Sequence, residues 1–123
     1  MDNIKFTLPA KAEYLLAVRL TASAIGTRRE LGIDAIESFK SAVSEGCLIV
    51  MGSSGCTKLD IEFFIDTNKL YVEIMGIDVS DDRPEVTELE ISKFMLEAMA
   101  VNVKYQQDDN SNIYVVTFTA AEE

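Results

Sequence analysis

The sequence predicts an α+β fold, a two-layer α/β sandwich in which helices cover one face of a mostly antiparallel sheet. Two observations lead to this class. Apolar residues recur at a period of two in five short stretches, as in strands, and at three- or four-residue intervals in three others, as in helices. Two pairs of strands are joined by short turns, so antiparallel neighbours outnumber parallel crossovers. The predicted order of elements is β-αα-ββ-α-ββ.

The first part of the chain is expected to form a strand and then a helix. Residues 4–8 alternate apolar and polar side chains, and Pro9 ends this strand because proline cannot donate to a ladder. From Ala12 to about Ile25 the apolar side chains have helical spacing. Gly26 and the polar residues that follow it end that helix.

The middle of the chain is expected to form a long helix and a β-hairpin. Asp34 is the predicted N-cap of the helix, and its apolar stripe runs through residues 36–50. A loop rich in glycine and serine follows at residues 52–55. Strict alternation in residues 58–65 and 70–74, on either side of a polar turn, predicts two antiparallel strands.

The last third of the chain predicts another helix and another hairpin. Pro84 suits the first turn of a helix that continues through Leu89 to Met99. Residues 101–105 and 113–119 alternate again around an acidic turn.

Composition limits the classes of function. With 123 residues, the chain fits one domain spanning residues 1–123. The net charge of −10 argues against nucleic acid as a partner, and the absence of histidine argues against zinc sites and Ser-His or Cys-His catalysis. No apolar run is long enough to span a membrane, and the start does not resemble a secretory signal. Cys47 and Cys56 are expected to be reduced, inert thiols in a cytoplasmic protein.

One stretch of the chain resembles a known family. The run of residues 42–47, Ala-Val-Ser-Glu-Gly-Cys, is similar to the N-box A-V-S-E-A-C-T-N-A of the RsbW family of anti-sigma-factor serine kinases, part of the GHKL (Bergerat-fold) ATPases. Residues 18–23, Val-Arg-Leu-Thr-Ala-Ser, and residues 95–99 occur in the family's order. The resemblance implies the histidine-kinase-like ATPase fold, use of ATP and magnesium, a sigma factor or a STAS-type anti-anti-sigma partner, and often a homodimer.

The same resemblance identifies positions where the nucleotide pocket has changed. Glu45 occupies the place of the family's general base. Ile49 stands one helical turn later, where the family has the asparagine that holds magnesium, and it offers no oxygen ligand. Ile49 is interpreted as a core side chain, with a partner surface as the alternative. We therefore expect no metal site here.

Two further elements of the pocket also depart from the pattern. Alignment by strand alternation places Gly76 at the adenine-reading aspartate of the family's D-x-G motif and Asp78 at its glycine. The glycine-rich lid of the family, whose backbone amides would meet the phosphates, is replaced by a stretch that includes Glu90 and Ser92.

The preferred interpretation is a regulatory protein that binds a sigma factor or a STAS-type partner without efficient use of ATP. The resemblance implies that Arg19 contacts the partner, although a lone arginine on a helix can also be a solvated charge. Two alternatives remain open. The first is a working serine/threonine kinase that uses ATP and magnesium, with Glu45 as its base. The second is a structural relic of the fold. No cofactor is expected unless the kinase alternative holds.

Overall fold

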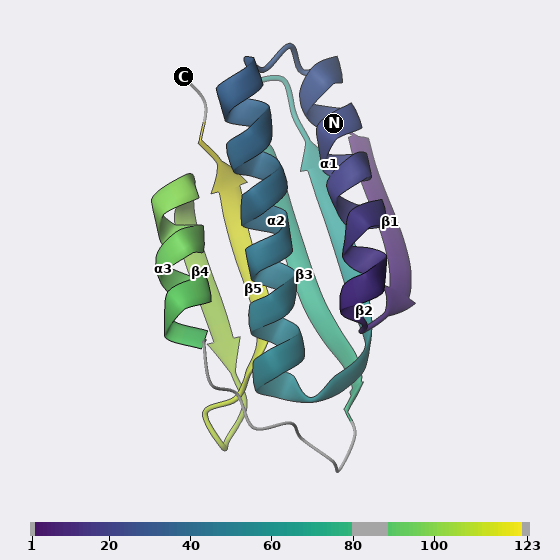
Figure 1. The fold of residues 1–123 in the computed structure, drawn as a ribbon, viewed down its shortest axis with the longest axis vertical. Coiled ribbons are helices and arrows are strands. Elements are labelled where there is room, and N and C mark those ends of the chain that lie inside the picture. Colours follow the sequence, from purple (N-terminus) through teal and green to yellow (C-terminus); the bar gives the residue numbers. More distant parts are fainter. Residues whose placement is uncertain (1, 80–88, 122–123) are drawn as a thin grey trace.

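The computed structural model describes residues 2–79 and 89–121, and it has the predicted α+β architecture (Figure 1). The elements follow one another in the predicted order, with one short 3₁₀ helix added before the first α-helix. Their bounds are β1 (Asp2–Pro9), η1 (Ala12–Tyr14), α1 (Leu15–Arg28), α2 (Ile33–Ser54), β2 (Cys56–Ile65), β3 (Leu70–Val79), α3 (Leu89–Met99), β4 (Ala100–Gln107) and β5 (Ile113–Ala120).

The five strands form one sheet in the order β1-β2-β3-β5-β4, and every neighbouring pair is antiparallel. The strand register places apolar residues opposite one another on the same face of adjacent strands. Ile61 of β2 lies opposite Ile74 of β3, which lies opposite Val116 of β5. All three side chains are fully buried. Apolar and polar residues therefore alternate along the strands because one face of the sheet is buried and the other is open.

Helices α1, α2 and α3 lie side by side over one face of the sheet, with α2 in the middle (Figure 1). Helix α2 packs tightly on the sheet at Gly46. A Cβ atom there would lie 2.6 Å from the Cδ1 atom of Ile74, so the helix reaches this depth because residue 46 has no side chain. Phe39 packs edge-on against Phe63 on the same face of α2, with ring centroids 6.1 Å apart.

Several predicted boundaries were wrong by a few residues. Gly32, not Asp34, is the N-cap of α2, and Asp34 lies in the first turn, where its charge favours the helix dipole. Helix α2 also runs through the predicted loop to Ser54 and ends at Gly55, which has a left-handed φ of 70°. The predicted helix start at Pro84 lies outside the described residues. None of the described helices is long and apolar enough to cross a membrane.

Candidate functional site

Helix α2 holds the two N-box positions, Glu45 and Ile49, one turn apart on the same side of the helix. Ile49 is fully buried, which confirms its interpretation as a core side chain. Glu45 is half-buried, and its Oε2 atom is buried without a hydrogen-bond partner among residues 2–79 and 89–121. A buried carboxylate oxygen without a donor costs free energy, so Glu45 is a candidate for function.

Gly76 lies on β3 beneath the last turns of α2. A Cβ atom at this position would lie 2.8 Å from Ser54 Oγ, 2.9 Å from Cys56 Cβ and 2.9 Å from Val50 Cγ1. These distances are shorter than van der Waals contact, so a larger side chain cannot enter without movement of the helix or the strand. The position aligned with the family's adenine-reading aspartate therefore has no room for a carboxylate in this structure.

Asp78, two residues further along β3, lies away from that packed region. Its side chain is exposed, and its Oδ2 atom lies 3.5 Å from the Nζ atom of Lys58 on β2. The backbone of Asp78 has a left-handed φ of 53°, a conformation in which glycine is the least strained residue. The conformation thus suits the glycine that the family's motif has at the aligned position, while the carboxylate forms a surface ion pair.

The stretch aligned with the lid forms the first turns of α3, which packs along α2. Glu90 is almost fully exposed, and its Oε1 atom lies 3.7 Å from Lys93 Nζ. Ser92 is half-buried. The ammonium of Lys93 in turn lies over the ring of Tyr105, 5.2 Å from its centroid. The described part of this stretch therefore offers a helical turn with a carboxylate in place of a loop of free amides.

Arg19 of α1 and the N-box meet directly. The Nη1 atom of Arg19 donates a hydrogen bond of 3.0 Å to the Oγ atom of Ser44, a buried residue of α2. The side chains of Leu16 and Leu20 on α1 are 63% and 61% exposed. Leu16 and Leu20 lie one turn apart, and Arg19 follows Leu16 by three residues, so the exposed leucines and the half-buried arginine form one patch on α1.

Helix α2 links most of the predicted site residues, but they do not form one open site. Glu45 and Ile49 lie on it, Gly76 packs under its end, Arg19 is bonded to it, and α3 lies along it. Asp78 is directed elsewhere. No group of three or more His, Cys, Asp or Glu residues that could hold a metal ion occurs in the described part of the chain.

Sequence reasoning missed two features of this region. The role of Ser44 as the hydrogen-bond partner of Arg19 was not predicted, although Ser44 belongs to the N-box run. Tyr105 was not singled out, yet its hydroxyl oxygen is buried and has no hydrogen-bond partner in the described part of the chain. Burial, followed by the charges of Glu97 and Glu90, raises the pKa of Tyr105 to about 12. Inward-facing alternation on β4 was the signal that could have identified it.

The two cysteines behave as expected for inert thiols. Both Cys47 and Cys56 are free and buried. Burial raises the pKa of each thiol, so neither is a thiolate nucleophile at neutral pH.

Comparison with known proteins gives a consistent set of relatives. The chain is 31% identical over 99 residues to the serine-protein kinase RsbW of Bacillus cereus strain AH820, covering 75% of this chain and 62% of that protein. It is 31% identical over 84 residues to RsbW of Bacillus thuringiensis strain Al Hakam, covering 66% and 52%. The chain thus spans between half and two thirds of these relatives. No family model matches it.

Proposed function

We propose that this chain is a regulatory module that holds a protein partner and makes little use of ATP. It belongs to the RsbW-like family of anti-sigma-factor serine kinases. The observation that carries this proposal is the patch on α1. Arg19 is fixed by Ser44, and two leucines beside it are left exposed. An arginine flanked by apolar side chains is the composition that protein interfaces favour.

The wider helix layer supports a protein partner. Folded monomers leave single apolar side chains exposed, but larger groups of them mark contact surfaces. Several such side chains lie on the three helices, far from the charged open face of the sheet: Leu16, Leu20, Leu48, Ile91, Phe94 and Met95. By analogy with the family, the partner is a sigma factor or a STAS-type anti-anti-sigma protein, and the module is a homodimer. The module and its partner act in the cytoplasm.

The residues present do not fit a nucleotide with its magnesium ion at the family's position. A buried isoleucine at position 49 supplies no oxygen to a cation that requires octahedral oxygen ligands. Position 76 has no space for an adenine-reading carboxylate. Glu90, which bears a negative charge, stands in the stretch where phosphates would approach. These three features support a module with reduced use of ATP.

One observation favours the kinase as a second candidate. The Oε2 atom of Glu45 is buried and has no hydrogen-bond partner among the described residues, as is common for groups that act on a substrate. A general base acts on a hydroxyl within hydrogen-bond reach, so this role requires a bound substrate to approach Glu45. Incorporation of labelled phosphate into a STAS protein, lost on Glu45→Gln, would support the kinase over the binding module.

The charge reversal Arg19→Glu tests the binding module. The probes are a purified sigma factor and a purified STAS protein, each immobilised for interferometry. We expect affinity for the true partner to fall about tenfold or more, because like charges facing across an interface cost several kcal/mol. Loss of the bond to Ser44 should lower the free energy of unfolding by about 0.5–1.5 kcal/mol.

Arg28→Glu is the matched control, since Arg28 is an exposed arginine of the same helix, nine residues further on. It should leave partner affinity within about twofold, because solvent and salt screen a charge that lies outside the contact. Undiminished capture by a folded Arg19→Glu variant would contradict the proposed contact. Capture of neither probe by the parent protein would favour a structural relic.

A further inference from the structure

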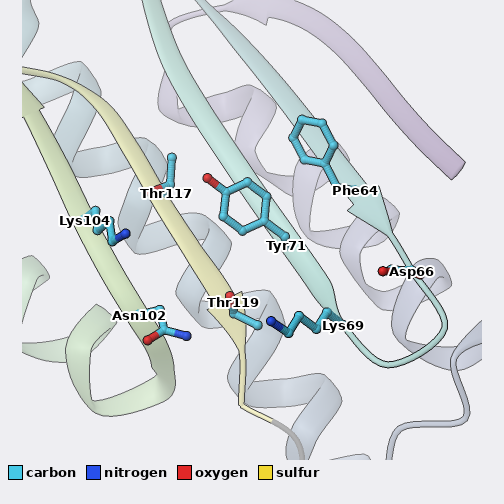
Figure 2. Close-up of a pocket in the computed structure, with 8 residues that line it drawn as sticks. All are labelled: Phe64, Asp66, Lys69, Tyr71, Asn102, Lys104, Thr117 and Thr119. Atoms are coloured by element: carbon cyan, nitrogen blue, oxygen red, sulfur yellow. The ribbon is translucent and has the colours of Figure 1, made fainter. Parts of the chain in front are cut away.

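A hollow of about 430 Å³ lies on the open face of the sheet, opposite the helices (Figure 2). Eight residues line it, drawn from β2, β3, β4, β5 and the turn between β2 and β3. They are Phe64, Asp66, Lys69, Tyr71, Asn102, Lys104, Thr117 and Thr119. This site is on the other side of the sheet from Arg19 and the N-box, so the inference does not rest on the proposed function.

The floor of the hollow is a row of side chains fixed by strand register. Phe64 of β2 lies opposite Tyr71 of β3, and Tyr71 lies opposite Thr119 of β5. Residues directly opposite in antiparallel strands project from the same face. The rings of Phe64 and Tyr71 have centroids 5.3 Å apart. These aromatic side chains form the apolar part of the hollow, on β2 and β3.

An irregularity in β4 shapes the far wall. The register between β4 and β5 shifts between Val101 and Lys104, and Asn102 has a left-handed φ of 53°. An extra residue of this kind bends a strand and redirects its side chains, and such bulges are frequent beside functional sites. Asn102 and Lys104 both reach the hollow as a result, and Lys104 lies opposite Thr117.

The polar side chains of the hollow form two groups of donors. In Figure 2 the ammonium of Lys69 lies beside Thr119, and the amide nitrogen of Asn102 points toward the same corner. The ammonium of Lys104 lies toward Thr117 further along β4 and β5, and the ring of Tyr71 lies beside these two threonines on the β3 side. Each group therefore combines a positive charge with a hydroxyl.

None of these donors is used by the described part of the fold. Among residues 2–79 and 89–121, the side chains of Lys69, Lys104, Asn102, Thr117 and Thr119 form no hydrogen bond or ion pair. Four other lysines each lie within 4 Å of a carboxylate. These are Lys5, Lys40, Lys58 and Lys93.

The acid of the lining, Asp66, lies in the same turn as Lys69 but forms no ion pair with either lysine of the hollow in the described part of the chain. Asp66 lies at the edge of the hollow, away from Asn102 and Lys104 (Figure 2). Its Oδ1 atom accepts a hydrogen bond of 2.7 Å from the backbone amide of Thr67. Glu73 lies opposite Thr117 on the neighbouring strand, so acids border the hollow, but Lys69 and Lys104 form no ion pair within the described residues.

We propose that this hollow binds a small molecule that carries at least two oxyanion groups. One oxyanion meets Lys69, Thr119 and Asn102, and the other meets Lys104 and Thr117. Ammonium, hydroxyl and amide donors are the side chains that phosphate and carboxylate oxygens accept from. The ring of Tyr71 packs against the part of the molecule that links the two charged ends.

Titration of the isotope-labelled full chain, followed by amide chemical shifts, tests the proposal. Pyrophosphate and citrate are the probes with two or more oxyanion groups, and inorganic phosphate is the comparison with one group. The experiment is done without magnesium at a constant ionic strength of about 100 mM, set with a monovalent salt, because the multivalent probes themselves contribute to screening. We expect saturable shifts at the residues of the hollow, with pyrophosphate or citrate binding at least several-fold more tightly than phosphate. Which of the two binds identifies the oxyanion as phosphate or carboxylate.

Matched double variants separate a site from a general effect of charge. Lys69→Gln/Lys104→Gln should raise the apparent Kd about tenfold or more, because it removes one cation from each donor group. Lys5→Gln/Lys58→Gln removes the same charge from paired lysines elsewhere on this sheet and should change Kd less than about threefold. An equal loss in both variants, shifts that map to the helix layer, or no saturation by about 10 mM of any probe would overturn the proposal.

Discussion

Replacement of Ile49 by the asparagine that the family has at this position tests whether the nucleotide pocket can be restored by one change. Ile49 is fully buried on the central helix. Removing it forfeits about 1.5–3 kcal/mol of apolar burial, and the new amide adds unpaired donors to the interior. We expect Ile49→Asn to lower the free energy of unfolding by about 2–4 kcal/mol in total. For a chain of this length that is roughly a 10–15 °C fall in Tm.

Denaturant unfolding and thermal melts measure this loss, with Ile49→Val as the control. The valine variant keeps an apolar side chain and should lose about 0.5–1.5 kcal/mol. Neither the parent nor Ile49→Asn should gain a thermal shift from millimolar Mg-ATP, whereas a ligand at 100 times its Kd adds about 2.7 kcal/mol. An unchanged Tm would refute the core role of Ile49. A saturable ATP shift that persists in Lys69→Gln/Lys104→Gln would restore the kinase candidate.

Two further predictions concern other buried positions. Gly76→Ala should lower the free energy of unfolding by about 1–3 kcal/mol, because its Cβ would lie within 3 Å of three atoms. Gly26→Ala should be tolerated, because its nearest neighbour, the side chain of Ile36, can move. Equal urea midpoints for the two variants would contradict this. Tyr105 has a folded pKa of about 12, above its ordinary value near 10, so its contribution to stability is present below pH 10 and lost as the pH rises toward 12. Tyr105→Phe should be at least as stable at pH 8, since the hydroxyl has no hydrogen-bond partner among the described residues. It should show a smaller fall in unfolding free energy between pH 10 and 12, since the titrating group is removed.

The fold followed from the sequence because its periodicity is unambiguous. Alternation on β2 and β3 reflects a sheet with one covered face, so residues such as Ile61 and Ile74 identify both strands and their register. Helix ends were less predictable. Serine and glycine at the end of α2 suggested a loop. In the structure, the Oγ atom of Ser54 donates a hydrogen bond of 2.6 Å to the carbonyl oxygen of Val50, and Gly55 supplies the left-handed cap.

The candidate site was predictable only as a set of positions. The pattern placed Glu45 and Ile49 on one helix, and the burial of Ile49 followed from its apolar character. The pattern did not show that Gly76 packs against Cys56 and the end of α2, because that distance depends on how closely two distant segments approach. The hollow around Lys69 and Lys104 was also beyond the sequence, since it brings together the turn after β2 and a bulge in β4.

The packing around α2 explains why the changes in the nucleotide pocket belong together. Ile49 and Val50 are consecutive, buried residues of α2, and Val50 contacts the space that a side chain at Gly76 would occupy. An aspartate at position 76 would have to displace the same turn that Ile49 helps to hold in place. A polar residue at position 49 would in turn weaken the packing that keeps this turn against β3. Each change thus makes reversal of the other more costly, so a single substitution that restores one family residue should disturb the core before it recreates a nucleotide site.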